Sequence, residues 1–100
     1  MKVVYTSQAW LSIDSNIEFL YRQGLTEEKI AEIIDQVFER AESLINFPFS
    51  GQTEPMLSSQ RKDYRRLTIS HYKIIYFIEQ ETVFITDIFD SRQDPNKMKG

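Results

Sequence analysis

The sequence predicts a single α+β domain over residues 1–100, in which a helical hairpin packs on one face of a mainly antiparallel β-sheet. Three observations lead to this prediction. The chain has 100 residues, 41% of them hydrophobic and 13% aromatic, which suits one core and is too short for two. Residues 7–45 repeat their apolar positions with helical spacing, whereas residues 64–90 are β-branched, aromatic and alternating. The expected order is therefore β-α-α-β-β-β.

The N-terminal part predicts a strand followed by a helix. Lys2–Thr6 is rich in Val and Tyr, as strands are. Ser7 is a suitable N-cap for a helix that has Arg22 in its last turn and Gly24 as its stop. We expect the buried stripe of this helix to consist of Trp10, Ile13, Ile17, Leu20 and Tyr21. The sequence leaves open which strand lies beside the first one.

A second helix follows almost at once. Thr26 is its expected N-cap, and Glu27 and Glu28 suit the positive end of the helix dipole. Proline disfavours helical backbone in the residue before it, so Asn46–Pro48 ends the helix. The short connection predicts an antiparallel hairpin, which needs a sheet to cover its apolar side. The expected buried stripe is Ile30, Ile33, Ile34, Val37, Ala41, Leu44 and Ile45.

After a loop at Phe49–Gln60, three strands are expected at Tyr64–Ser70, Tyr72–Glu79 and Val83–Asp90. Alternation in the middle strand places Lys73 on the face away from the helices, and Arg66 in the preceding strand turns the same way. We expect both cations to be accessible there, with no acid–base side chain beside them. The face beneath the helices should carry Tyr72, Ile74, Tyr76 and Ile78.

The charge is small in total and uneven along the chain. The net charge is −3. Residues 18–42 hold seven acidic and three basic residues, a net charge of −4, whereas residues 61–73 hold five basic and one acidic, a net charge of +4. Indiscriminate binding to nucleic acid depends on a surplus of cations. We therefore expect an acidic side and a basic side, and no general affinity for nucleic acid.

The residue types present argue against several kinds of site. The chain has no Cys, one His and three scattered Gly, so neither a thiolate site, a zinc site nor a glycine-rich phosphate loop is expected. Asp87, Asp90 and Asp94 are close in sequence, but Asp87 and Asp90 should project from opposite faces of their strand. We expect no metal and no cofactor. Neither a signal peptide nor a membrane span is indicated, and a cytoplasmic protein is expected.

The element order, together with the segments Tyr64–Leu67, Tyr72–Tyr76 and Phe89–Pro95, resembles the RelE/ParE family over nearly the whole chain. This family contains the toxins of bacterial type II toxin–antitoxin pairs. The resemblance implies one of two activities. RelE-like members cut messenger RNA in the ribosome, and ParE-like members poison DNA gyrase without a known hydrolytic site.

Cutting RNA requires a base, an acid and cations that stabilise the phosphate. By resemblance, Arg66, Lys73 and Arg92 fall near the positions that supply cations in RelE-like members. RNA-cutting members carry a Tyr or His after the last strand, whereas Ser91–Gly100 has neither, and the only histidine, His71, lies in a predicted hairpin turn. We therefore expect a gyrase inhibitor. A ribosome-dependent endoribonuclease that uses these four residues is the alternative, and an inactive relative that only binds its antitoxin is the third.

The resemblance also implies a cognate antitoxin, which would lay an amphipathic helix and an extended segment across the hairpin and sheet, with possible oligomers of the complex. The apolar candidates for this contact lie off the expected buried stripes, and a place at the periphery of the core is their alternative. The basic candidates contact either the antitoxin or the target, unless they are solvated surface. The candidate contact residues are Leu11, Phe19, Phe38, Arg61, Arg65, Arg66, Lys73 and Arg92.

Overall fold

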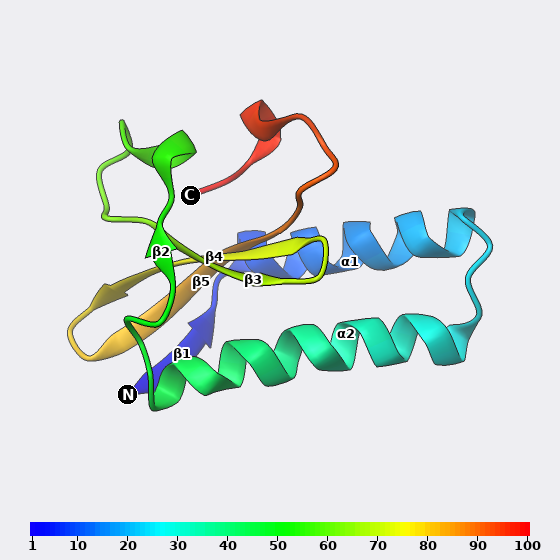
Figure 1. The fold of residues 1–100 in the computed structure, drawn as a ribbon, viewed down its shortest axis with the longest axis horizontal. Helices are drawn as coiled ribbons and strands as arrows, with labels where there is room; N and C mark the ends of the chain where they lie inside the picture. The colour runs from blue at the N-terminus through cyan, green and yellow to red at the C-terminus, as the bar shows by residue number, and fades with distance from the viewer.

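Two antiparallel helices lie along a five-stranded sheet in the computed structural model, which describes all 100 residues (Figure 1). The α+β class and the predicted order are confirmed. A two-residue strand is added within the segment that was predicted as a loop. The helices and strands are β1 Lys2–Tyr5, α1 Ser7–Arg22, α2 Glu27–Glu42, β2 Gln52–Thr53, β3 Arg65–Ile69, β4 Tyr72–Glu79 and β5 Thr82–Asp90. Short 3-10 helices occupy Ser43–Ile45, Pro55–Leu57 and Pro95–Lys97.

The strands are ordered β1-β5-β4-β3-β2, and β1–β5 is the only parallel pair. This order answers the question that the sequence left open. The first strand lies at an edge of the sheet, where residues 2–5 pair with residues 82–85 of the last strand. The first and last strands of the chain therefore lie side by side in one sheet.

The main core lies between the helices and the sheet. The middle strand contributes Tyr72, Ile74 and Tyr76 to it, as predicted. A register shift in the β4–β5 ladder places Ile75 opposite Asp87 and Tyr76 opposite Ile85, so Thr86 is an extra residue. The remaining members of the core cluster are Ala9, Ile13, Val37, Ala41, Leu44, Leu67, Val83, Ile85 and Ile88.

A smaller cluster covers part of the other face. It brings Leu57 of a 3-10 helix and Met98 of the C-terminal segment onto Ile75 and Phe89 of the sheet. The backbone N–H of Lys99 donates to Asp87 Oδ2 at 2.9 Å, which fixes the C-terminal segment to β5. Both faces of this part of the sheet are therefore covered.

The predicted start of α1 was wrong by one residue. Thr6, and not Ser7, is the N-cap, because its side-chain oxygen accepts from the N–H of Ala9 at 3.2 Å. The prediction for α2 is confirmed, since the Thr26 side chain accepts from the N–H of Lys29 at 3.2 Å.

The predicted buried stripe of α1 was partly wrong. Trp10 and Tyr21 are each 48% exposed, and the residues that α1 buries are Ala9, Ile13, Asn16 and Leu20. This stripe was missed in the sequence because one of its members, Asn16, is polar.

Asn16 is buried because it completes the edge of β5. Beyond Ile85 this strand has no strand neighbour on the β1 side. Asn16 Nδ2 donates to the Ile88 C=O at 2.8 Å, and Ser12 Oγ accepts from the Ile88 N–H at 2.8 Å. These bonds satisfy backbone groups that would otherwise be unpaired at a sheet edge. They also fix α1 to the sheet.

Neither α1 nor α2 is long and apolar enough to span a membrane.

Candidate functional site

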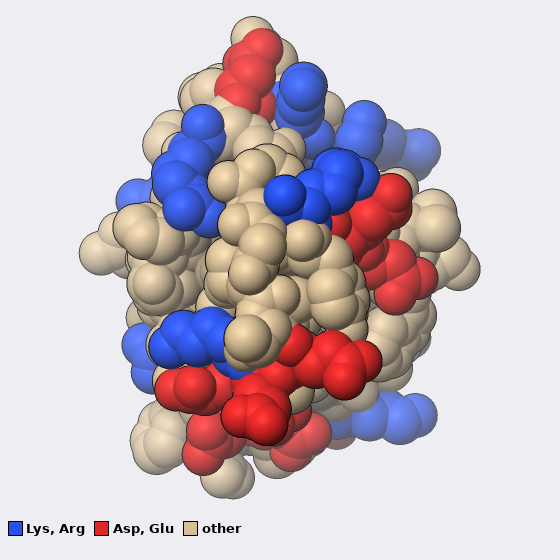
Figure 2. All heavy atoms as spheres, turned by 90° about the vertical axis from the view of Figure 1, so that its right-hand side faces the viewer, with Lys and Arg blue, Asp and Glu red and all other residues tan.

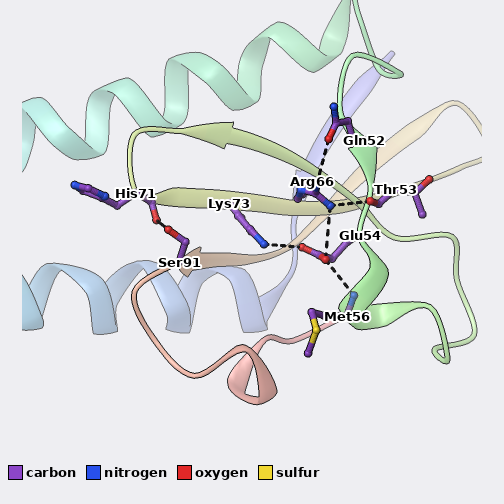
Figure 3. Close-up of polar contacts among 8 residues, drawn as sticks. All are labelled: Gln52, Thr53, Glu54, Met56, Arg66, His71, Lys73 and Ser91. Carbon is purple, nitrogen blue, oxygen red and sulfur yellow. Dashed lines mark hydrogen bonds and ion pairs between the residues drawn. The ribbon is translucent and has the colours of Figure 1, made fainter.

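The two strand cations that the sequence singled out lie on the face away from the helices. Arg66 of β3 pairs with Ile75, and Lys73 of β4 pairs with Thr68, so all four residues share that face. Glu54 reaches between the two cations (Figure 3). Lys73 Nζ is 3.2 Å from Glu54 Oε1, and Arg66 Nη1 is 3.7 Å from Oε2. The Glu54 side chain is only 1% exposed, whereas those of Arg66 and Lys73 are 24% and 27% exposed.

The local sequence explains how Glu54 comes to lie there. Glu54 precedes Pro55. Proline suits the first position of a helix, because the backbone N–H that proline lacks would be unpaired at that position. Glu54 caps this 3-10 helix by accepting from the Met56 N–H at 3.1 Å. Arg66 also donates to the Thr53 C=O at 2.8 Å and to Gln52 Oε1 at 3.1 Å. These contacts hold β2 against β3.

The expectation that Arg66 and Lys73 are accessible and have no acid–base side chain beside them was therefore wrong, since both are about three-quarters buried and both contact Glu54. Glu54 was missed because no pattern in the sequence of residues 49–60 indicates that the Glu54 side chain contacts residues of β3 and β4. The Glu54–Pro55 pair, with an acceptor before a proline, was the one available signal of an N-cap. Both Glu54 carboxylate oxygens accept hydrogen bonds, Oε1 from Lys73 and Oε2 from the Met56 N–H, and the carboxylate balances the charge of the two cations from a buried position.

Arg92 forms a second, separate ionic group with Asp90. Its Nε is 2.9 Å from Asp90 Oδ1, and its Nη2 is 2.7 Å from Oδ2, a bidentate pair. The hydrogen bonds from Arg92 lower the pKa of the Asp90 carboxyl, against the opposing effect of its burial. The same pair raises the pKa of Arg92.

Asp87 and Asp90 lie on opposite faces, as predicted. Asp90 pairs with Tyr72 on the helix side, and Asp87 pairs with Ile75 on the other side. Burial is the main cause of the raised pKa of Asp87, and the hydrogen bond from the Lys99 N–H opposes it.

A cleft of about 500 Å³ lies between the helices and the turn that joins β3 to β4. Apolar side chains from both helices and both strands form much of its wall, among them Phe19, Ile33 and Ile69. His71 and Arg92 are among its polar lining residues. Figure 2 looks at this end of the molecule, where acidic side chains gather in the lower part and basic ones in the upper part. The cleft therefore combines an apolar wall with ionisable groups.

The four residues of the predicted ribonuclease site do not form one cluster. Arg66 and Lys73 meet at Glu54, whereas His71 and Arg92 line the cleft, and no hydrogen bond or ion pair joins the two groups. The His71 carbonyl accepts from the Ser91 N–H at 2.7 Å and from Ser91 Oγ at 2.8 Å (Figure 3). This contact fixes the start of the C-terminal segment at the β3–β4 turn.

The other candidate residues lie apart from both groups. Arg61 is exposed in the loop before β3. Arg65 donates to the carbonyls of Phe49 and Gly51, at 3.2 and 2.6 Å. Leu11 is 62% exposed on α1. The remaining one, Phe38, packs against the core and against the ring of Tyr5, which agrees with a peripheral core position.

Comparison with protein families gives one match, the ParE toxin of the type II toxin–antitoxin system parDE, over residues 3–95. The chain belongs to the ParE toxin family. Among curated proteins, none matches the chain. Family membership makes this chain the toxin of a type II toxin–antitoxin pair, and the family implies a cognate antitoxin as partner. The RelE/ParE resemblance noted from the sequence is thus confirmed.

Because Arg92 and Asp90 form an ion pair at the cleft, we expect the stability of this ParE-family toxin to depend on pH. A carboxyl with a lowered pKa contributes stability that is present above its ordinary value, 3.8 for Asp90, and is lost as the pH falls through the folded-state pKa. Arg92→Gln should therefore lower the free energy of unfolding at pH 7 by about 1 kcal/mol, since Arg92 is half exposed. The difference from the wild type should shrink as the pH falls below 3.8.

Urea denaturation of both proteins from pH 7 to pH 3 measures this difference. Asp87 titrates in the opposite direction, but it is present in both proteins and cancels. Lys97→Gln, which removes an exposed cation without an ion-pair partner, is the matched control. A deficit in Arg92→Gln that is the same at every pH would contradict the assignment.

Proposed function

We propose that this ParE-family toxin inhibits DNA gyrase, is neutralised by its cognate antitoxin, and acts in the cytoplasm without a cofactor. The observation that carries this proposal is the state of Arg66 and Lys73. Both cations, which the RelE resemblance would assign to the phosphate, are held by the buried Glu54 and lie apart from Arg92. A ribonuclease would need its cations, base and acid around one phosphate.

The antitoxin is expected to use the apolar cleft. Its wall includes side chains of α1 and α2, among them Phe19, and an amphipathic helix binds a groove of this kind by its apolar side. The exposed Leu11 on α1 would extend that contact.

Purified toxin and gyrase test the proposal. We expect the toxin to block supercoiling of relaxed plasmid and to trap cleaved DNA, and we expect the antitoxin, added in equal amount, to restore supercoiling. Unchanged supercoiling, together with codon-positioned cuts in a translated messenger RNA, would contradict gyrase inhibition. Activity in neither assay would indicate a relative that only binds its antitoxin.

One observation favours the ribonuclease as second candidate. His71, Tyr72 and Arg92 line a single cleft, which places two groups able to carry a proton near one cation. On this alternative, messenger RNA cutting should be abolished in Arg92→Ala and in His71→Ala. Cutting that both variants retain would rule out the cleft as the catalytic site.

A further inference from the structure

The two most exposed large apolar side chains of the molecule lie two residues apart. Phe47 is 67% exposed and Phe49 is 66% exposed. Both belong to residues 46–51, the segment between the 3-10 helix at Ser43–Ile45 and β2, which we call the Phe loop. Two solvated aromatic rings in one short loop have no role in the core, and exposed apolar groups of this kind mark interaction sites.

The backbone of the Phe loop is held by the buried hydroxyl of Tyr76. This tyrosine is fully buried in β4, and its Oη donates to the Pro48 C=O at 2.8 Å and accepts from the Gly51 N–H at 3.1 Å. Within the loop, the Ser50 N–H donates to the Phe47 C=O at 3.1 Å. The loop is therefore anchored to the centre of the sheet.

Arg65 holds the same loop from its outer side. Its guanidinium donates to the Phe49 and Gly51 carbonyls and lies 5.4 Å from the centre of the Phe49 ring. Gly51 packs so closely that a Cβ there would lie 2.5 Å from both the Arg66 carbonyl oxygen and Tyr76 Oη. The carbonyls of Phe47, Pro48, Phe49 and Gly51 all accept hydrogen bonds.

A loop fixed in this way presents its rings in one arrangement before any partner arrives. Pre-organisation lowers the entropy cost of binding, and aromatic and arginine side chains are enriched at protein interfaces. The cation of Arg65 beside Phe49 adds a preference for negative charge in the partner.

We propose that the Phe loop is the surface by which this toxin docks on its cellular target, a folded protein that offers an apolar pocket edged by carboxylates. The inference rests on the toxin function proposed above. The loop follows the end of α2, whereas the α1–α2 connection lies at the other end of the molecule and the β3–β4 turn points towards that end (Figure 1). An antitoxin segment seated in the cleft would therefore leave the loop for a different partner. The net charge of −3 leaves no surplus of cations for a phosphate backbone, which favours a protein over a nucleic acid.

The test compares the double variant Phe47→Ser/Phe49→Ser with the wild type. Both rings are solvated, so the variant should keep the circular dichroism spectrum, the unfolding midpoint and the affinity for the antitoxin. We expect its inhibition of cell growth, titrated by inducible expression at matched protein level, to be weaker by about tenfold or more. Tyr21→Ser is the control, because it removes a ring that is 48% exposed near the C-terminal end of α1. This variant should inhibit growth as strongly as the wild type does.

A second variant separates the rings from their positioning. Tyr76→Phe keeps both phenylalanines but removes the two hydrogen bonds of Tyr76 to the loop, so its growth inhibition should fall between those of the wild type and the double variant. Growth inhibition equal to the wild type in the double variant would overturn the inference. So would a loss of antitoxin affinity in that variant, because the loop would then be an antitoxin surface.

The growth readout does not depend on which target is correct. A wild type that stops growth without blocking supercoiling, with a double variant that does neither, would refute gyrase and support the docking loop. A wild type and a double variant that block supercoiling equally would support gyrase and overturn the loop. A wild type that leaves growth unchanged would overturn both.

Discussion

Glu54→Ala is expected to lower the free energy of unfolding by about 3 kcal/mol, because it leaves two cations without their buried counter-charge. The carboxylate contacts Lys73 at 3.2 Å and Arg66 at 3.7 Å, and it also caps the 3-10 helix at Met56. The two cations are about three-quarters buried, so water replaces only part of the lost interaction. Urea denaturation at pH 7 measures the change.

Two controls separate the charge from the size of the side chain. Glu54→Gln keeps the volume and an acceptor for the Met56 N–H, and it should cost less than Glu54→Ala. Glu79→Gln breaks the ion pair with Lys62 at the surface, where both side chains are more than 40% exposed, and it should cost about 0.5 kcal/mol. If Glu54→Ala costs no more than Glu79→Gln, the role of Glu54 as a buried counter-charge is wrong.

Gly51→Ala should be destabilising by about 3 kcal/mol, because an added methyl group meets atoms that have no room to move. The new Cβ would lie 2.5 Å from the Arg66 carbonyl oxygen in β3 and 2.5 Å from the hydroxyl of the fully buried Tyr76. The backbone of β3 or the anchor of the Phe loop must therefore shift. The unfolding midpoint in urea or on heating reports the loss.

Gly24→Ala is the matched control for a different glycine effect. Gly24 has a φ of +86° after α1, and a Cβ there would meet nothing within 4 Å. Only the left-handed backbone is strained, which should cost about 1 kcal/mol. Equal losses in the two variants would contradict the steric account of Gly51.

The sequence predicted those parts of the fold that depend on local pattern. The cap at Thr26 and the strand Tyr72–Glu79 were predicted correctly, because a capping side chain and a period of two can be read within a few residues. Trp10 and Tyr21 were placed in the core wrongly. The true stripe of α1 passes through Asn16, whose burial depends on a backbone carbonyl 72 residues away.

The candidate site was less predictable than the fold for the same reason. Arg66 and Lys73 were placed on the correct face by alternation, but their partner Glu54 comes from a segment without periodicity. The Phe loop was missed as well. Phenylalanine is usually a core residue, and the bonds that hold the loop backbone come from Tyr76 and Arg65 in strands distant along the chain.

The pairing of β1 with β5 sets a limit on when this protein can finish folding. Residues 2–5 leave the ribosome before the rest of this domain, yet their partners at residues 82–85 are synthesised only after both helices and the other strands. Until then the N-terminal strand has no neighbour and the hairpin of α1 and α2 lacks most of the sheet that it covers. The finished toxin surface therefore forms only after β5 has been synthesised, and a product truncated before β5 would lack it.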